Sequence, residues 1–271
     1  MTQEAAERDP VAGQDAGPEP EEAHGLDAGA ASEAAGKPDI RPGDRPGELL
    51  VFDHGFVRLD DAMADDLSVV NGARVSFAVR KETMDDRDKG LIRFLMRSSH
   101  GSPFEHNSFR FHIRTPIFVA REWFRHRIGS FNEESARYHQ LEGDFYVPAP
   151  RAVRTQVGKP GSYSFEPAEG AVAADTIDTF RRVYTQLYEE YRALIDKGVA
   201  KELARALLPF GIYTQFYWTL NARSLMNFLS LRNSDSAQYE IRTYAEAVER
   251  LFAERMPVTH GCFLEFGRKV P

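Results

Sequence analysis

The chain has 271 residues, which is enough for one large domain or two small ones. Its formal charge of −7 is unevenly spread: residues 1–47 hold eleven acidic and four basic residues, whereas residues 48–271 hold thirty of each. A neutral body argues against a general nucleic-acid-binding protein, and no run of about 18 apolar residues exists to span a membrane. With a single cysteine, Cys262, and no secretory signal, we expect a cytoplasmic protein without internal disulfides.

Residues 1–47 are rich in alanine, glycine and proline and contain no aromatic residue. Such a segment buries too little apolar surface to offset the entropy of ordering it, so we expect a disordered acidic tail. A tail that docks a partner is the alternative, but the composition favours a solubilising extension. Residues 48–271 show no linker and no internal repeat and are predicted to form one domain.

The first half of this domain is predicted from its apolar spacing. Residues 108–114 are the clearest strand, because apolar and polar side chains alternate strictly. Thr115-Pro116 then begins a helix that we expect to end near Arg127. The other expected elements are strands at 49–52 and 73–79 and helices at 60–70 and 85–98.

The second half is predicted to be mostly helical. A long amphipathic helix begins near Asp175 and ends at Gly198, and residues 212–220 form a strand rich in aromatic and β-branched side chains. The other expected elements are a loop at 148–170 and helices at 200–208, 222–231 and 235–255. Together the elements predict an α+β fold in which long helices flank a central antiparallel or mixed sheet.

Residues 125–138 form the densest polar stretch of the chain, with three arginines, a histidine and two glutamates. Arginine keeps its charge, and its planar fork matches phosphate oxygens. We expect a helix, a break at Gly129 and a second helix near Asn132, whose free N–H groups also favour an anion. A phosphate-bearing ligand is the inference, and a solvated charged helix end is the alternative.

The order of residues in this stretch resembles the signature of flavin-dependent thymidylate synthases. It begins with Arg-His-Arg, contains Asn132-Glu133 and closes with Ser-Ala-Arg-Tyr. Residues 49–265 are similar to the family, and the tail is not. Further stretches that resemble family motifs are 73–76, 100–106, 116–121, 221–228, 231–232 and 237–241.

The resemblance implies the reductive methylation of dUMP to dTMP, a step of de novo dTMP biosynthesis. It implies 5,10-methylenetetrahydrofolate as the carbon donor, FAD as the hydride donor and NADPH as the reductant. It also implies a homotetramer that shares its active sites between subunits. No cysteine attacks the pyrimidine in this family, and Cys262 lies among apolar neighbours, which disfavours a classical cysteine-dependent synthase.

Site residues follow from the resemblance position by position. Supporting roles are expected for His100 and Glu105. The residues expected to bind dUMP are Glu122, Trp123, Phe124, Arg125, Glu133, Glu134, Ser135, Ala136, Arg137, Arg205 and Arg232. The residues expected to bind FAD are Ser102, Arg125, His126, Arg127, Glu133, Asn221, Ala222, Arg223 and Asn227.

Arg232 matches the arginine that activates dUMP in the family. Negative charge grows at the N3/O4 side of the uracil ring as C5 becomes a nucleophile, and a permanent cation stabilises that charge most in the transition state. Ser135 has no evident neighbouring base, so we expect it to position the substrate rather than attack it. Two positions depart from the family pattern: Glu122 replaces the usual glutamine, and Ser236 replaces a frequent histidine.

Other features have plainer interpretations. The spacings of the histidines match no metal-ligand pattern, so no metal is expected. Most large aromatic side chains are expected in the core or at subunit contacts. Two rival functions stay open: a flavoprotein that acts on another pyrimidine nucleotide, and an RNA-binding module that uses the arginine cluster.

Overall fold

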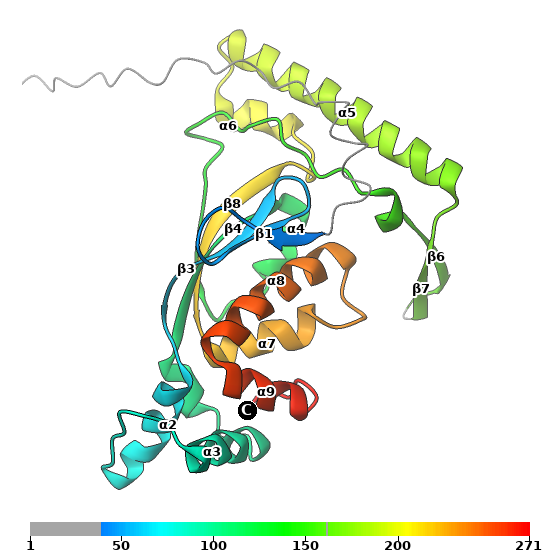
Figure 1. Cartoon of the computed structure of the whole chain (residues 1–271). Coiled ribbons are helices and arrows are strands. Elements are labelled where there is room, and N and C mark those ends of the chain that lie inside the picture. The colour runs from blue at the N-terminus through cyan, green and yellow to red at the C-terminus, as the bar shows by residue number, and fades with distance from the viewer. Residues whose placement is uncertain (1–38, 161) are drawn as a thin grey trace, which may run out of the picture.

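A computed structural model describes residues 39–160 and 162–271. Its centre is an antiparallel sheet with the strand order β1-β2-β3-β4-β8-β5, and β6 and β7 form a separate hairpin (Figure 1). The strands are β1 (Ile40–Pro42), β2 (Glu48–Val51), β3 (Gly55–Met63), β4 (Ser108–Pro116), β5 (Ser130–Glu133), β6 (Arg154–Lys159), β7 (Ser162–Pro167) and β8 (Tyr213–Asn221). The expected α+β fold with a central sheet and flanking helices is confirmed.

Helices α7 and α8 lie beside the sheet, α2 and α3 lie at one end of the molecule, and α5 lies at the opposite end (Figure 1). Among the described helices, none combines the length and the apolar composition needed to cross a membrane. The α-helices are α2 (Asp66–Arg74), α3 (Asp86–Arg97), α4 (Ile117–Trp123), α5 (Gly170–Asp196), α6 (Lys201–Ala204), α7 (Ala222–Arg232), α8 (Tyr239–Arg255) and α9 (Pro257–Glu265). The 3₁₀ turns are η1 (Val75–Phe77), η2 (Ser102–His106), η3 (Pro150–Ala152) and η4 (Arg205–Leu207).

The central strand β4 shows why the sheet has one apolar face. Phe109, Phe111 and Ile113 are fully buried on the side of the helices, which confirms the alternation in the sequence. Trp123 at the end of α4 stacks on Phe228 of α7, with ring centroids 4.8 Å apart. Aromatic packing of this kind is worth more than area burial alone and fixes α4 and α7 against the sheet.

Several expected elements differ in the structure. Residues 73–79 are not a strand, because α2 continues to Arg74 and Val75 and Phe77 of η1 remain 71% and 81% exposed. The expected helix at 60–70 is split, since β3 extends to Met63 and Asp65 caps α2 by accepting a bond from the Ser68 N–H. The predicted loop at 148–170 contains the hairpin β6–β7, and α9 was not anticipated.

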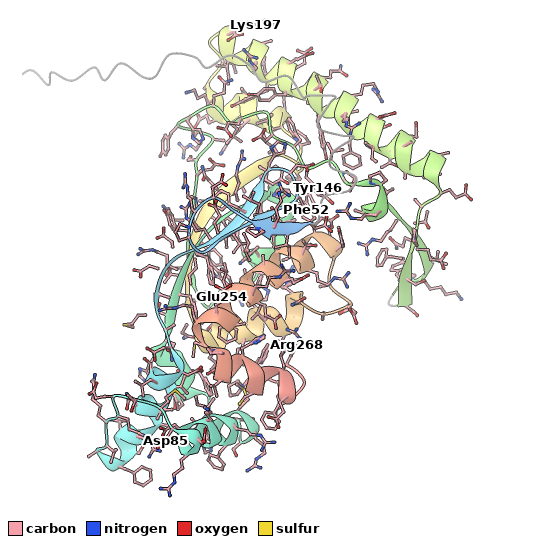
Figure 2. All side chains as sticks on the ribbon, viewed as in Figure 1. Phe52, Asp85, Tyr146, Lys197, Glu254 and Arg268 are labelled. Carbon is pink, nitrogen blue, oxygen red and sulfur yellow. The ribbon has the colours of Figure 1, made fainter. Side chains whose placement is uncertain are left out.

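The predicted boundary of the tail also shifts. Ile40–Pro42 pairs with β2, and the Arg41 Nη1 group donates a hydrogen bond of 2.7 Å to the Phe52 carbonyl. Phe52 and Tyr146, labelled in Figure 2, pack with tilted rings whose centroids lie 5.2 Å apart, and they cover this corner of the sheet. Residues 39–47 therefore belong to the described domain, and the rest of the expected tail lies outside the described residues.

Helix α8 carries a buried carboxylate that joins it to the end of the chain. Glu249 accepts hydrogen bonds from Arg268 Nη1 at 2.7 Å and from the Asn233 amide, and it pairs with His260 Nε2 at 2.8 Å. Burial opposes the charge on Glu249, yet the bonds from His260, Arg268 and Asn233 lower its pKa to about 2. The folded state thus favours the ionised carboxylate.

We expect Glu249→Gln to reduce the free energy of unfolding by about 2 kcal/mol at pH 7, because it removes a hydrogen-bonded charge. The native carboxylate contributes fully above its unfolded pKa of 4.5 and loses this contribution as the pH falls toward about 2. The difference in the free energy of unfolding between wild type and variant, measured with urea, therefore becomes smaller as the pH falls. Glu246→Gln, an exposed change on the same helix, is the control, and a gap that stays constant with pH contradicts the prediction.

Candidate active site

The arginine-rich stretch passes from the end of α4 into β5, and the second helix expected near Asn132 is wrong. Residues Ser130–Glu133 instead pair with β8, and α4 ends at Trp123 rather than near Arg127. Gly129 makes this turn possible, because a Cβ atom there would lie 3.0 Å from Trp218 Nε1 and 3.1 Å from the Thr219 carbonyl. The glycine allows the backbone to approach β8 and become an edge strand.

Arg232 is held in place at the last residue of α7. Its Nη1 donates to Glu122 Oε2 at 3.0 Å, and its Nη2 donates to the Glu122 carbonyl at 3.2 Å. Its Nε donates to His126 Nε2 at 3.0 Å. A guanidinium has five N–H groups, so one on each Nη is left over and has no acceptor within the described part of the chain.

The surroundings of His126 and Glu122 shift their pKa values in opposite directions. Burial, reinforced by Arg232, lowers the pKa of His126 to about 4, so its ring is neutral at pH 7 and its Nε2 accepts from Arg232. Burial raises the pKa of Glu122, and Arg232 counteracts that rise, whereas Glu240 adds to it. The Arg232–Glu122 pair is about three-quarters buried, which strengthens its attraction relative to a surface pair.

Glu133 and Glu134 leave β5 on opposite faces of the sheet. Glu133 Oε1 accepts a bond of 2.8 Å from Thr214 Oγ1, on the side of the buried core. Glu134 accepts bonds from Gln215 on the other face, through the main-chain N–H at 3.0 Å and Nε2 at 3.2 Å. The two adjacent carboxylates therefore have different hydrogen-bond partners on opposite faces of the sheet.

Arg137 and Arg205 meet around one acidic residue. Arg137 Nε pairs with Glu202 Oε2 at 3.3 Å, and Arg205 Nε donates to the Glu202 carbonyl at 3.4 Å. Between them and β5, Ala136 is buried in a small cluster with Phe145, and Ser135 Oγ makes only a long contact of 3.4 Å with the Arg137 N–H. The structure thus brings two of the residues expected to bind dUMP to one place.

Four of the residues predicted to bind FAD lie in α7 or at its N-cap, namely Asn221, Ala222, Arg223 and Asn227, whereas Arg125, His126 and Arg127 lie between α4 and β5. Arg223 Nε donates to the Pro271 carbonyl at 2.7 Å, and its Nη1 donates to Glu105 Oε1 at 2.9 Å. Gly101 allows this approach, because a Cβ atom there would lie 2.5 Å from Arg223 Nε. Asn227 is exposed one turn further along α7 and lies on the same side of the helix as Arg223.

Other predicted residues have structural roles in this chain. Asn221 caps α7 by accepting from the Ser224 N–H at 2.8 Å, and His100 packs edge-on against Phe94. The side chains of Trp123 and Ala222 are fully buried, and Phe124 packs edge-on against Phe131. Trp123 and Ala222 therefore have main-chain groups, and not side chains, with which to contact a ligand.

The donor set fits a flavin dinucleotide, whose phosphates need cations and neutral donors. Arg125 and Arg127 are exposed and pair with no acid within the described residues, and Ser102 is exposed at the start of η2. Within the same part of the chain, no group of three or more histidine, cysteine, aspartate or glutamate side chains is arranged to hold a metal ion.

The structure adds residues that the sequence interpretation did not single out for the site. Gln215 holds Glu134, Glu202 joins Arg137 to Arg205, and Pro271 contacts Arg223. Glu240 is buried, accepts from Tyr146 Oη at 2.9 Å and raises the pKa of Glu122. Only Glu240 had a signal in the sequence, since it lies in the stretch 237–241.

Comparisons with known proteins identify the family of this chain. The family model described as "Thymidylate synthase complementing protein" matches residues 58–258. A flavin-dependent thymidylate synthase of Thermosipho africanus is 46% identical over 222 residues, covering 82% of this chain and 96% of the relative. One from Thermus thermophilus is 44% identical over 221 residues, covering 81% and 79%.

A solved structure is also similar throughout the domain. The UMP/dUMP methylase PolB from Streptomyces cacaoi, bound with 5-Br UMP, has a TM-score of 0.75 and 45% identity. The similarity covers 81% of this chain and 97% of that one. A second structure of PolB holds 5-Br dUMP, with the same TM-score and identity.

Proposed function

Because this chain belongs to the flavin-dependent thymidylate synthase family, we propose that it converts dUMP to dTMP by reductive methylation in de novo dTMP biosynthesis. The carbon comes from 5,10-methylenetetrahydrofolate. Bound FAD, reduced by NADPH, supplies the hydride. The single observation that carries the proposal for this chain is the fixed position of Arg232, which leaves one N–H on each Nη for a ligand.

Arg232 is the catalytic residue in this proposal. Charge grows at the N3/O4 side of uracil when C5 attacks the one-carbon unit, and the two N–H groups that Arg232 leaves unbonded stabilise that charge. Glu122 and neutral His126 fix the guanidinium before the substrate arrives, which avoids the cost of ordering it during the reaction. Glu122 therefore contributes to dUMP binding through Arg232, which accounts for a carboxylate next to an anionic nucleotide.

The remaining predicted ligands divide between the two partners. We assign the dUMP phosphate to Arg137, Arg205 and Arg125, with Ser135 orienting the pyrimidine. Arg223, Asn227 and Ser102 are proposed to hold the flavin dinucleotide, together with Arg127 and the main chain of Asn221 and Ala222. Support comes from the exposure of these arginines, of Ser102 and of Asn227, and from the position of Arg223 and Asn227 on one face of α7.

A homotetramer with shared active sites is part of the proposal. Leu203 and Phe210 are 66% and 68% exposed around Arg205, and Tyr138 beside Arg137 is 79% exposed. Soluble monomers rarely expose apolar side chains so close together, so these residues suit a subunit contact at the edge of the nucleotide site. Light scattering of the purified protein tests this directly.

The proposed activity is tested with [5-³H]dUMP. We expect tritium release that requires methylenetetrahydrofolate and NADPH, and a yellow protein whose flavin spectrum bleaches with NADPH. Release of no tritium by fully flavinated protein contradicts the proposal. A colourless protein with RNA affinity that falls steeply with salt would support the RNA-binding rival instead.

UMP is the second candidate substrate, because the similar methylase PolB is described as acting on UMP and dUMP. Competition between [5-³H]dUMP and unlabelled UMP gives the ratio of kcat/KM for the two nucleotides. A ratio above about 100 in favour of dUMP assigns the enzyme to deoxynucleotide metabolism, because a discrimination of that size is worth about 2.7 kcal/mol.

A further inference from the structure

A continuous chain of hydrogen bonds crosses the polar face of the sheet and ends on the signature stretch. Glu48 of β2 pairs with Arg58 Nη1 at 3.3 Å, and Arg58 Nη2 lies 2.7 Å from His112 Nδ1. His112 Nε2 lies 3.0 Å from Gln215 Oε1, and Gln215 Nε2 donates to Glu134 Oε2 at 3.2 Å. The chain therefore links five strands, from β2 through β3, β4 and β8 to the end of β5.

Arg58 determines which atom donates and which accepts in each hydrogen bond of this series. A guanidinium only donates, so His112 Nδ1 must be the unprotonated nitrogen and Nε2 must carry the hydrogen. Nε2 then donates to Gln215 Oε1, which orients the Gln215 amide so that its NH₂ group faces Glu134. Burial and the charge of Arg58 lower the pKa of His112, which agrees with this neutral tautomer.

Gln215 holds Glu134 at three points. Its main-chain N–H and its side-chain NH₂ each donate to one carboxylate oxygen, and its carbonyl accepts the Glu134 N–H at 3.0 Å. His139 adds a contact of 3.4 Å to the same carboxylate, whose side chain is only 17% exposed. Because β5 ends at Glu133, these bonds fix the chain where it leaves the sheet toward residues 135–137.

We propose that His112 and Gln215 are positioning residues for the nucleotide site: they fix Glu134 and thereby the backbone of residues 135–137. This inference rests on the proposed function, because it assigns those residues to dUMP. Neither side chain touches the substrate. Because they order residues 135–137 before the nucleotide binds, less of the binding free energy is lost in ordering this segment, and the affinity for the nucleotide is higher.

The test compares two substitutions at His112 in the flavin-loaded enzyme. His112→Phe keeps the ring that packs on Phe56 and stacks on Tyr217, with centroids 5.0 and 4.7 Å away, but it removes both hydrogen bonds. His112→Gln restores one acceptor and one donor at similar separation. Arg110→Gln, on the same face of β4, is the matched control.

We expect His112→Phe to raise the Kd for dUMP by calorimetry, and the KM, by about 10-fold, with kcat changed less than about twofold and the flavin content unchanged. His112→Gln is expected to return both constants to within about threefold of wild type, and Arg110→Gln to leave them unchanged. A Kd for His112→Phe equal to that of wild type overturns the proposal, and so does a His112→Gln enzyme as weak as His112→Phe.

Two further measurements keep the outcomes separate. If His112→Phe fails to fold, Gln215→Met tests the same chain, since it removes the side-chain amide and keeps the main-chain bonds to Glu134, and a normal Kd there overturns the proposal. Wild-type protein that binds dUMP but releases no tritium contradicts the proposed function alone, because the comparison of Kd values among variants still decides the role of His112 and Gln215.

Discussion

Arg232→Lys is expected to reduce tritium release from [5-³H]dUMP at least about 100-fold, while the Kd for dUMP changes only a few-fold. Lysine keeps the positive charge but has a single nitrogen with three N–H groups, so it cannot make the three bonds to Glu122 and His126 and also keep two N–H groups for the substrate. Loss of one preorganised donor at a developing negative charge typically costs a factor of 10²–10³ in rate. Single-turnover assays with pre-reduced flavin measure the effect on the methylation half-reaction.

The control for this prediction is Arg250→Lys, an exposed change in an i,i+4 pair with Glu246 on α8. It is expected to leave both turnover and dUMP affinity within about twofold of wild type. If Arg232→Lys also turned over at a near-normal rate, Arg232 would have no catalytic role. A loss of dUMP affinity with unchanged kcat would instead make it a binding residue.

Asp88→Asn is expected to lower the free energy of unfolding by about 3–5 kcal/mol. The Asp88 carboxylate is fully buried and accepts from Arg74 Nη2 at 2.6 Å, from Lys81 Nζ and from the Asp85 N–H. Its pKa lies well below the ordinary value because these donors outweigh the cost of burial. Asparagine replaces one of the two carboxylate oxygens with an NH₂ group, so either Arg74 or Lys81 loses its acceptor, and the negative charge that both cations face is lost.

Asp86→Asn is the matched control, because Asp86 lies in the first turn of the same helix but is 96% exposed and pairs only with Lys89. It is expected to change stability by less than about 0.5 kcal/mol in urea unfolding. Asp85 of this helix end is labelled in Figure 2, at the end of the molecule formed by α2 and α3. Equal effects of the two substitutions contradict the prediction.

The Asp88 substitution is also expected to affect the region proposed to bind the flavin. Gly72 of α2 packs against Pro103 of η2, where a Cβ atom would lie 3.5 Å from the proline backbone. Because Asp88 joins α2 to α3 through Arg74, a weakened pair loosens the support of Ser102 and Glu105. Weaker flavin retention is expected to accompany the loss of stability in Asp88→Asn.

The regular elements followed from side-chain periodicity where one face of an element is buried. The alternation around Phe109 and Phe111 predicted β4 correctly, and the apolar spacing along 85–98 predicted α3. The prediction of a strand at 73–79 was wrong because it relied on the β propensity of Val75 and Phe77. Both side chains are exposed, so no packing against a sheet accompanies that propensity. β5 was misread as a helix because its polar side chains gave no alternation.

The site was predicted residue by residue only where the resemblance supplied motifs. Local sequence does not show which distant strand a residue faces, so the bonds from Gln215 to Glu134 and from Arg223 to the Pro271 carbonyl were not predictable. The position of Glu122 against Arg232 likewise joins residues 110 positions apart. The sequence showed only that Glu122 replaces a glutamine, and the structure shows that this carboxylate pairs with Arg232.

The contact between Asp66 and α9 has a consequence for how the chain is made. The Asp66 carboxylate accepts from the N–H groups of Val258 and Thr259 at 2.8 Å, across 192 and 193 positions of sequence. During synthesis, α2 therefore leaves the ribosome long before the two N–H groups that bond to Asp66. In the same way, β4 is made long before β8, the strand with which it pairs. A nascent chain arrested before α9 lacks the apolar side chains of α9 that complete the core, and the apolar surface left exposed is the feature that chaperones recognise.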